Sequence, residues 1–105
     1  DFTHISDLTE CLAKLSNNKK VHENKIFNIT FGNSRSIKEL IKILKKEIGT
    51  ITVNYKKRDK LMPFRGTLSN NEAKKLLNFK PRYNLETGVK RLVKWYKKKY
   101  TNDLT

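Results

Sequence analysis

The chain has 105 residues, of which 36% are hydrophobic, so it can close over one small core but not over two domains. Its single cysteine, Cys11, excludes an internal disulfide and a cysteine-based zinc site. No segment has the pattern of a signal peptide or a membrane span, and together these features predict a cytoplasmic protein.

The formal net charge is +14, with 19 Lys against 5 Arg. A charge of this size favours polyanionic partners such as nucleic acid or an anionic membrane surface. However, the lysines are spread along every helical pattern, which is typical of a solvated surface, and recognition of bases and phosphates favours arginine. We therefore interpret the charge as a surface property, and we expect neither nucleic acid nor a membrane as the partner.

The first part of the chain alternates strand and helix patterns. Residues 1–5 predict a strand, and Ser6 is a predicted N-cap for a helix whose apolar stripe includes Cys11, which we expect in the core. A polar loop is predicted over residues 16–24. Residues 25–31 (KIFNITF) are β-branched and aromatic, and they predict a second strand.

A helix, a strand and a loop are predicted next. Ser36 and Glu39 have the spacing of a capping box, and apolar residues follow at helical spacing. Gly49 is expected to end this helix in the left-handed conformation. Residues 51–56 alternate apolar and polar side chains and predict a third strand, whereas residues 57–67 lack a clear period and predict a loop.

Two helices are predicted near the end of the chain. A second capping-box spacing, Ser69 to Glu72, opens a short helix, and Asn84 can cap a longer one. The apolar face of the longer helix is predicted to comprise Leu85, Val89, Leu92, Val93 and Tyr96. We expect residues 1–100 to form one domain and residues 101–105 to be a frayed tail.

This order predicts an α/β fold of few short strands with about four helices. Two or three strands cannot easily bury both faces of a sheet alone, so an open sheet edge is expected. The chain therefore has the pattern of a part of a larger body.

The sequence lacks the chemistry of an oxidoreductase site. A dinucleotide needs a glycine-rich turn between strand and helix, and the four glycines are isolated. No tyrosine is followed four residues later by the lysine that would lower its pKa. His4 and His22 are too far apart in sequence to suggest a ligand pair. We therefore predict no catalytic, cofactor-binding or metal-binding residue.

Four blocks resemble, in order, the C-terminal part of the NAD-dependent epimerase/dehydratase family, the extended short-chain dehydrogenases. They are DFTHISDL at residues 1–8, FNITFGNSRSIKEL at 27–40, LMPFRGTLSNNEAKKLLNFKP at 61–81 and YNLETGVKRLVKWY at 83–96. Each block by itself also fits ordinary capping and packing, so the resemblance depends on the ordered set.

The resemblance implies the C-terminal, nucleotide-sugar-binding portion of an epimerase or dehydratase, such as an enzyme similar to UDP-glucose 4-epimerase. The N-terminal Rossmann half, which binds NAD in the family, is absent, so this chain is expected to be inactive alone. In the family, the parent enzyme is a homodimer that acts on a nucleotide-diphosphate sugar.

The resemblance also suggests two substrate-binding residues. Arg58 lies where family members often have an arginine that contacts the diphosphate or ribose, and Arg65 is a second candidate in the same loop. A guanidinium there would give bidentate phosphate contacts that lysine cannot reproduce. The alternative for either arginine is a solvated loop charge. The alternative for the whole chain is a small basic nucleic-acid-binding module that uses residues 90–100.

Overall fold

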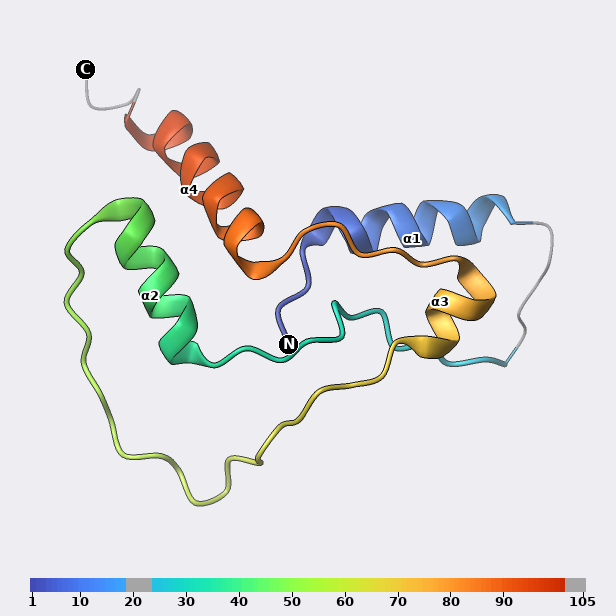
Figure 1. Ribbon diagram of the computed structural model, residues 1–105, viewed down its shortest axis with the longest axis horizontal. Coiled ribbons are helices and arrows are strands. Elements are labelled where there is room, and N and C mark those ends of the chain that lie inside the picture. Colours follow the sequence, from blue (N-terminus) through green and yellow to red (C-terminus); the bar gives the residue numbers. More distant parts are fainter. Residues whose placement is uncertain (19–23, 102–105) are drawn as a thin grey trace.

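The structure is a computed structural model that describes residues 1–18 and 24–101. This part of the chain forms the helices α1 Ile5–Asn17, α2 Ile37–Ile48, α3 Asn71–Leu77 and α4 Leu85–Thr101, which are labelled in Figure 1. They form two pairs, because α2 lies beside α4 and α1 lies beside α3. Five residues of the predicted loop, 19–23, which include His22, and the predicted tail beyond Thr101 lie outside the described residues.

The predicted α/β fold is wrong, because residues 1–18 and 24–101 contain helices and no strand. A strand pattern specifies an extended backbone, but a sheet also requires a neighbouring strand that offers unpaired N–H and C=O groups. Side chains take that role around residues 25–31. Asn28 Nδ2 donates to Ser69 O at 3.2 Å, and Asn70 Nδ2 donates to Thr30 O at 2.9 Å.

The caps of the first two helices confirm some predictions and correct others. His4, and not Ser6, is the N-cap of α1, because its Nδ1 accepts the Ser6 N–H at 3.1 Å. The capping box of α2 is confirmed: Ser36 Oγ accepts the Glu39 N–H, and Glu39 Oε2 accepts the Ser36 N–H. Gly49 ends α2 with φ 90° and ψ −145°, so its φ is positive but its conformation is not left-handed helical.

An asparagine stands at the N-cap position, directly before the first residue, of each of the last two helices. The predicted box from Ser69 to Glu72 is wrong, because Asn70 is the N-cap of α3 and makes no side-chain capping bond. Its amide instead donates to the carbonyls of residues 30 and 31. Asn84 is confirmed as the cap of α4, since its Oδ1 accepts the Thr87 N–H at 2.9 Å.

The core lies between α1 and α3. Its buried members are Cys11, Ala73, Leu77 and Phe79, and the partly buried Leu15, Phe27 and Ile29 pack against them. The prediction that Cys11 is a small core residue is confirmed, since it is 4% exposed. The core is small, since α1, α3, the 27–29 segment and Phe79 after α3 contribute seven side chains in all.

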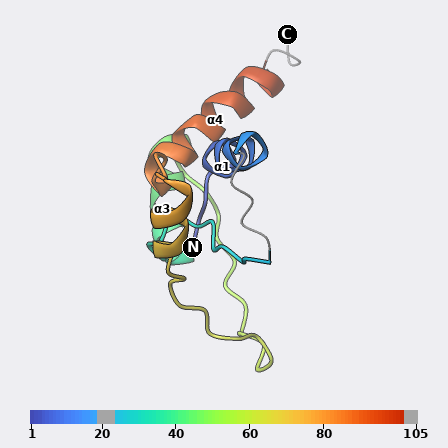
Figure 2. The same cartoon turned by 90° about the vertical axis from the view of Figure 1, so that its right-hand side faces the viewer.

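The described chain is a thin slab, 49 × 42 × 19 Å, as Figure 2 shows edge-on. Its radius of gyration is 17.4 Å, against about 13 Å for a compact domain of this length. The predicted apolar face of α4 is only partly buried: Leu85 and Val89 are covered, but Leu92 is 58% and Tyr96 57% exposed. None of the four described helices has the length and apolarity to cross a membrane.

Candidate functional site

The two arginines predicted from the sequence line the same open cavity, which has a volume of about 540 Å³. This arginine cavity lies where the first residues, the start of α2 and the 57–67 loop meet. Its lining comprises Asp1, Phe2, Ser34, Arg35, Ile37, Arg58, Met62, Pro63 and Arg65. Three arginines therefore line this cavity, and two of them, Arg58 and Arg65, were predicted from the sequence.

Arg58 is held by its own loop. Its Nη2 donates to the carbonyl oxygens of Met62 and Pro63, both at 2.8 Å, and its guanidinium lies 3.7 Å from the centroid of the Phe64 ring. A guanidinium has five N–H donors in a fixed fork. The donors on Nη1 and Nε make no hydrogen bond to any described residue, so Arg58 is oriented while part of its fork stays open.

Arg65 is less constrained. It is exposed, and within residues 1–18 and 24–101 it makes no hydrogen bond or ion pair. The neighbouring Thr67 ties the end of the loop to the start of α2, because Thr67 Oγ1 accepts the Ser34 N–H at 3.3 Å. The structure thus brings Arg65 to the arginine cavity, but its side chain is not held there.

Arg35 bridges α2 and α4. It donates from Nε to Glu39 at 2.9 Å and from Nη2 and Nη1 to Glu86 at 2.7 and 3.3 Å. The Arg35 guanidinium is the main cause of the lowered pKa of Glu86, whereas the Ser36 backbone N–H is the main cause of the lowered pKa of Glu39 and Arg35 contributes less. In return, Glu86 and then Glu39 raise the pKa of Arg35. Two carboxylates therefore balance the Arg35 charge.

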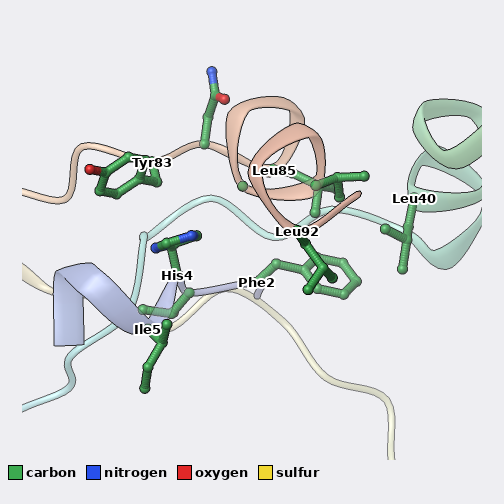
Figure 3. Close-up of a pocket in the computed structure, with 11 residues that line it drawn as sticks. Phe2, His4, Ile5, Leu40, Tyr83, Leu85 and Leu92 are labelled. Atoms are coloured by element: carbon green, nitrogen blue, oxygen red, sulfur yellow. The ribbon is translucent and has the colours of Figure 1, made fainter. Parts of the chain in front are cut away.

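A second cavity, of about 360 Å³, lies between residues 2–5, α2 and α4 (Figure 3). Figure 3 shows Leu92 of α4 beside the Phe2 ring, with His4 and Tyr83 facing each other at one side. The His4 and Tyr83 rings stack with centroids 4.4 Å apart. The lining is Phe2, Thr3, His4, Ile5, Leu40, Tyr83, Asn84, Leu85, Gly88, Val89 and Leu92. No acidic side chain, Lys or Arg is among them, so this apolar cavity suits apolar groups.

The described residues do not fit the NAD that the family resemblance implies. A dinucleotide site needs glycines where the chain enters a helix, so that the backbone can approach the pyrophosphate. Here α2 is entered through Ser34, Arg35 and Ser36, and the nearest glycine, Gly32, faces the Asn70 side chain. Within the described part of the chain, no three His, Cys, Asp or Glu side chains gather as a metal site would require.

Comparison with known proteins finds distant relatives that extend well beyond this chain. The chain is 31% identical over 104 residues to an uncharacterized protein of Methanocaldococcus jannaschii, covering 91% of this chain and 29% of that protein. It is 29% identical over 119 residues to UDP-glucuronate 4-epimerase 4 of Arabidopsis thaliana, covering 98% of this chain and 26% of that protein. It is 35% identical over 103 residues to UDP-glucuronate 4-epimerase of Thermodesulfobacterium geofontis, covering 92% of this chain and 30% of that protein.

The two epimerases support a link between this chain and the NAD-dependent epimerases, which is partial and distant. The predicted resemblance is confirmed at this level. The chain spans less than a third of the length of these relatives. No protein-family profile matches the chain, and no solved structure matches it.

Proposed function

We propose that these residues are the C-terminal, nucleotide-sugar-binding portion of an NAD-dependent sugar epimerase or dehydratase. The similarity to two UDP-glucuronate 4-epimerases supports this assignment, as do the four ordered sequence blocks. The remainder of the polypeptide then binds NAD and supplies the catalytic residues. On this proposal the 105-residue chain has no activity by itself.

The proposal depends most on the shared position of Arg58 and Arg65 at the arginine cavity. A nucleotide-diphosphate sugar carries its negative charge on adjacent phosphates, and a planar guanidinium can donate two parallel hydrogen bonds to such a group. Neither arginine has a carboxylate partner within the described residues. Both charges are thus available to an anionic ligand, while the charge of Arg35 is used to join α2 and α4.

Exposed apolar side chains support the role of a part that packs against more of the same protein. Leu92 and Tyr96 lie on α4, and Trp95 beside them is 52% exposed. Exposed apolar patches of this kind mark surfaces that a soluble protein covers by packing or binding. The large radius of gyration agrees with this interpretation, because a self-contained domain of this length is more compact.

Titration calorimetry of the complete polypeptide that carries these residues tests the proposal. We expect binding of UDP-glucuronate or UDP-glucose, and conversion of one bound sugar nucleotide in the presence of NAD. The double variant R58Q/R65Q should bind the sugar nucleotide more weakly than wild type, whereas K98Q, which removes one surface charge on α4, should not. Equal affinity in wild type and the double variant would contradict the proposed site.

A salt series with single-stranded RNA tests the alternative of a basic nucleic-acid module. Binding through phosphate neutralisation weakens steeply as salt is added. We expect no RNA binding near physiological ionic strength. Tight RNA binding under those conditions, together with no binding of a sugar nucleotide, would replace the proposed function.

A further inference from the structure

We infer that the hydroxyl of Ser34 completes an oxyanion-binding site with Arg58 and Arg65 in the arginine cavity. This inference rests on the proposed function, and it adds a polar contact that the sequence did not reveal. The ligand group is an oxyanion of the sugar nucleotide, which is either a phosphate or the carboxylate of a uronate sugar.

The first observation is that Ser34 Oγ is buried and has no hydrogen-bond partner among the described residues. A buried hydroxyl that lacks a partner loses its hydration without compensation, so folded proteins nearly always provide one. It is the only buried side-chain oxygen or nitrogen atom in the described residues with this property. Ser34 also lines the arginine cavity, and because its Oγ is buried, a ligand in the cavity meets the hydroxyl once the Ser34 side chain turns toward it.

The second observation is that the backbone fixes the position of Ser34. Its N–H donates to Thr67 Oγ1 at 3.3 Å, which links it to the loop that carries Arg65. Two residues later Ser36 caps α2 through both bonds of the capping box. Ser34 therefore sits between two anchored points, and its side chain can turn about the Cα–Cβ bond to bring Oγ to a ligand oxygen without a change in the backbone.

The charges of the cavity favour an anion. Arg58 and Arg65 have no carboxylate partner within the described residues, whereas Arg35 is balanced by Glu39 and Glu86. Asp1 is the one acidic residue in the lining, and its Oδ2 already accepts the Gly32 N–H at 2.8 Å. An oxyanion could therefore accept hydrogen bonds from the open part of the Arg58 fork, from Arg65 and from Ser34 Oγ.

Titration calorimetry with three compounds separates the two sources of the oxyanion. The compounds are UDP, which carries only phosphates, glucuronate, which carries only the carboxylate, and UDP-glucuronate, which carries both. The protein is the complete polypeptide that contains these residues. The variants are S34A, which removes the hydroxyl, S34T, which keeps it, and S16A, the same change at an exposed serine of α1 whose hydroxyl bonds only to Ala13 O.

We expect S34A to weaken UDP-glucuronate binding by roughly 10- to 100-fold, the range for a lost hydrogen bond to a charged group. S34T should retain most of the affinity, and S16A should equal wild type. If S34A also weakens UDP binding, the oxyanion is a phosphate; if it weakens UDP-glucuronate binding but not UDP binding, the oxyanion is the uronate carboxylate. Either result supports the inference.

Two other results are distinguishable failures. If wild type binds UDP-glucuronate and S34A binds it equally well, the role of Ser34 is wrong but the proposed function stands. If wild type binds none of the three compounds, the proposed function is wrong as well. Should S34A fail to fold, the Ser34 amide resonance of the wild-type protein provides a second measurement. A shift of that resonance on addition of UDP-glucuronate is expected, and no shift would overturn the inference.

Discussion

Asp7 Oδ2 accepts a hydrogen bond from the backbone N–H of Tyr83 at 3.1 Å, although the two residues lie 76 positions apart in the sequence. The other carboxylate oxygen, Oδ1, accepts the N–H of Arg82 at 3.0 Å. Asp7 is only 3% exposed, so both bonds are shielded from water. This Asp7 clamp, formed by Asp7 with the N–H groups of Arg82 and Tyr83, fixes the segment before α4 against α1. It joins the first and last of the four blocks that resemble the epimerase family.

Replacing Asp7 with Asn should therefore destabilise the fold. The amide keeps one accepting oxygen but presents an NH₂ group to a backbone N–H, which leaves a buried donor unpaired. We expect a loss of about 1.5–3 kcal/mol in the free energy of unfolding, the range for hydrogen bonds to charged groups. Urea unfolding followed by circular dichroism measures this value.

The matched control is D59N in the exposed 57–67 loop. Asp59 Oδ1 accepts the Leu61 N–H at 2.9 Å, and an asparagine oxygen can do the same. We expect a change within about 0.5 kcal/mol, as for most surface substitutions. Similar stability losses in D7N and D59N would show that the Asp7 clamp contributes little.

Three glycines provide a graded test of backbone strain and space. Gly32 has φ +84°, and a Cβ there would lie 2.8 Å from Asn70 Nδ2. Gly49 has φ +90° but open space around it, and Gly66 has neither constraint. A non-glycine residue held in a sparsely populated region of positive φ costs about 1–3 kcal/mol. We expect G32A to destabilise most, G49A by roughly that strain alone, and G66A to be neutral or slightly stabilising.

Thermal unfolding of the three alanine variants measures this order. The additional loss in G32A arises because the Asn70 amide must leave the carbonyls of Thr30 and Phe31, to which it donates at 2.9 and 3.3 Å. The double variant G32A/N70A should remove the clash between the new Cβ and the Asn70 side chain. It also removes the two hydrogen bonds of Asn70 to residues 30 and 31. Equal melting temperatures for G32A and G49A would contradict the close packing of Gly32 against Asn70, because both variants share the strain of a positive φ.

The helices could be predicted because their determinants are local. The capping box of Ser36 and Glu39 and the cap at Asn84 depend on residues three apart, and both form in the structure. The cap of α1 was misassigned, because a histidine ring can accept the same N–H that a serine side chain usually does. The pattern at Ser69 was misleading, since Asn70 takes the cap position and its side chain bonds to distant carbonyls.

The strands could not be predicted reliably, because a sheet depends on partners that no local pattern reveals. Residues 25–31 and 51–56 have β-branched and alternating patterns, yet neither finds a neighbouring strand within the described residues. Side chains of Asn28 and Asn70 satisfy part of the extended backbone near residues 28–31 and 69 instead. Such side-chain bonds form only between residues that the fold brings together. The alternation of apolar and polar residues along the sequence therefore does not indicate whether strand pairing or side-chain bonds will satisfy the backbone.

The arginine cavity was partly predictable. Arg58 and Arg65 followed from the family resemblance, and the structure places both in the lining of one cavity. Arg35 was not predicted, because its role depends on Glu86, which lies 51 residues away. Ser34 was not predicted either, since an unpaired hydroxyl is defined only by what surrounds it in the fold.

The carboxylates around Arg35 make a pH-dependent contribution. The pKa values of Glu39 and Glu86 lie below the ordinary 4.5 in the folded chain. A lowered folded pKa stabilises the fold above the unfolded pKa, and this contribution is lost as the pH falls through the folded value. We therefore expect the melting temperature to be constant from neutral pH to about 5 as far as these two groups are concerned, and to fall below that.

The variant R35Q distinguishes the two carboxylates. In a ¹³C titration of the side-chain carboxyls, the midpoint of Glu86 should rise toward 4.5, because Arg35 is the main cause of its lowered pKa. The midpoint of Glu39 should rise less, because the Ser36 N–H remains its largest stabilising contact. R91Q removes an exposed arginine that bonds to Tyr83 and to no carboxylate, and it should leave both midpoints unchanged. Equal rises for Glu39 and Glu86 would contradict this assignment.

Replacing Arg58 with Lys tests whether the shape of the guanidinium matters as well as its charge. The Arg58 fork donates to Met62 O and Pro63 O through Nη2 and keeps Nη1 and Nε for a ligand. A lysine ammonium retains the charge, but its three donors cannot hold both carbonyls and also supply the separate Nη1 and Nε donors that Arg58 keeps for a ligand. We expect R58K to weaken UDP-glucuronate binding by roughly 10- to 100-fold, from the loss of one or two charge-assisted hydrogen bonds.

Calorimetry of R58K in the complete polypeptide checks this expectation, and F64L separates the ligand contact from the loop contact. F64L removes the ring that lies 3.7 Å from the Arg58 guanidinium but leaves every donor of the fork in place. Because the two carbonyl bonds still orient the side chain, F64L should weaken binding much less than R58K. If R58K binds as tightly as wild type, Arg58 is a solvated loop charge, and Arg65 and Ser34 would have to hold the oxyanion without it.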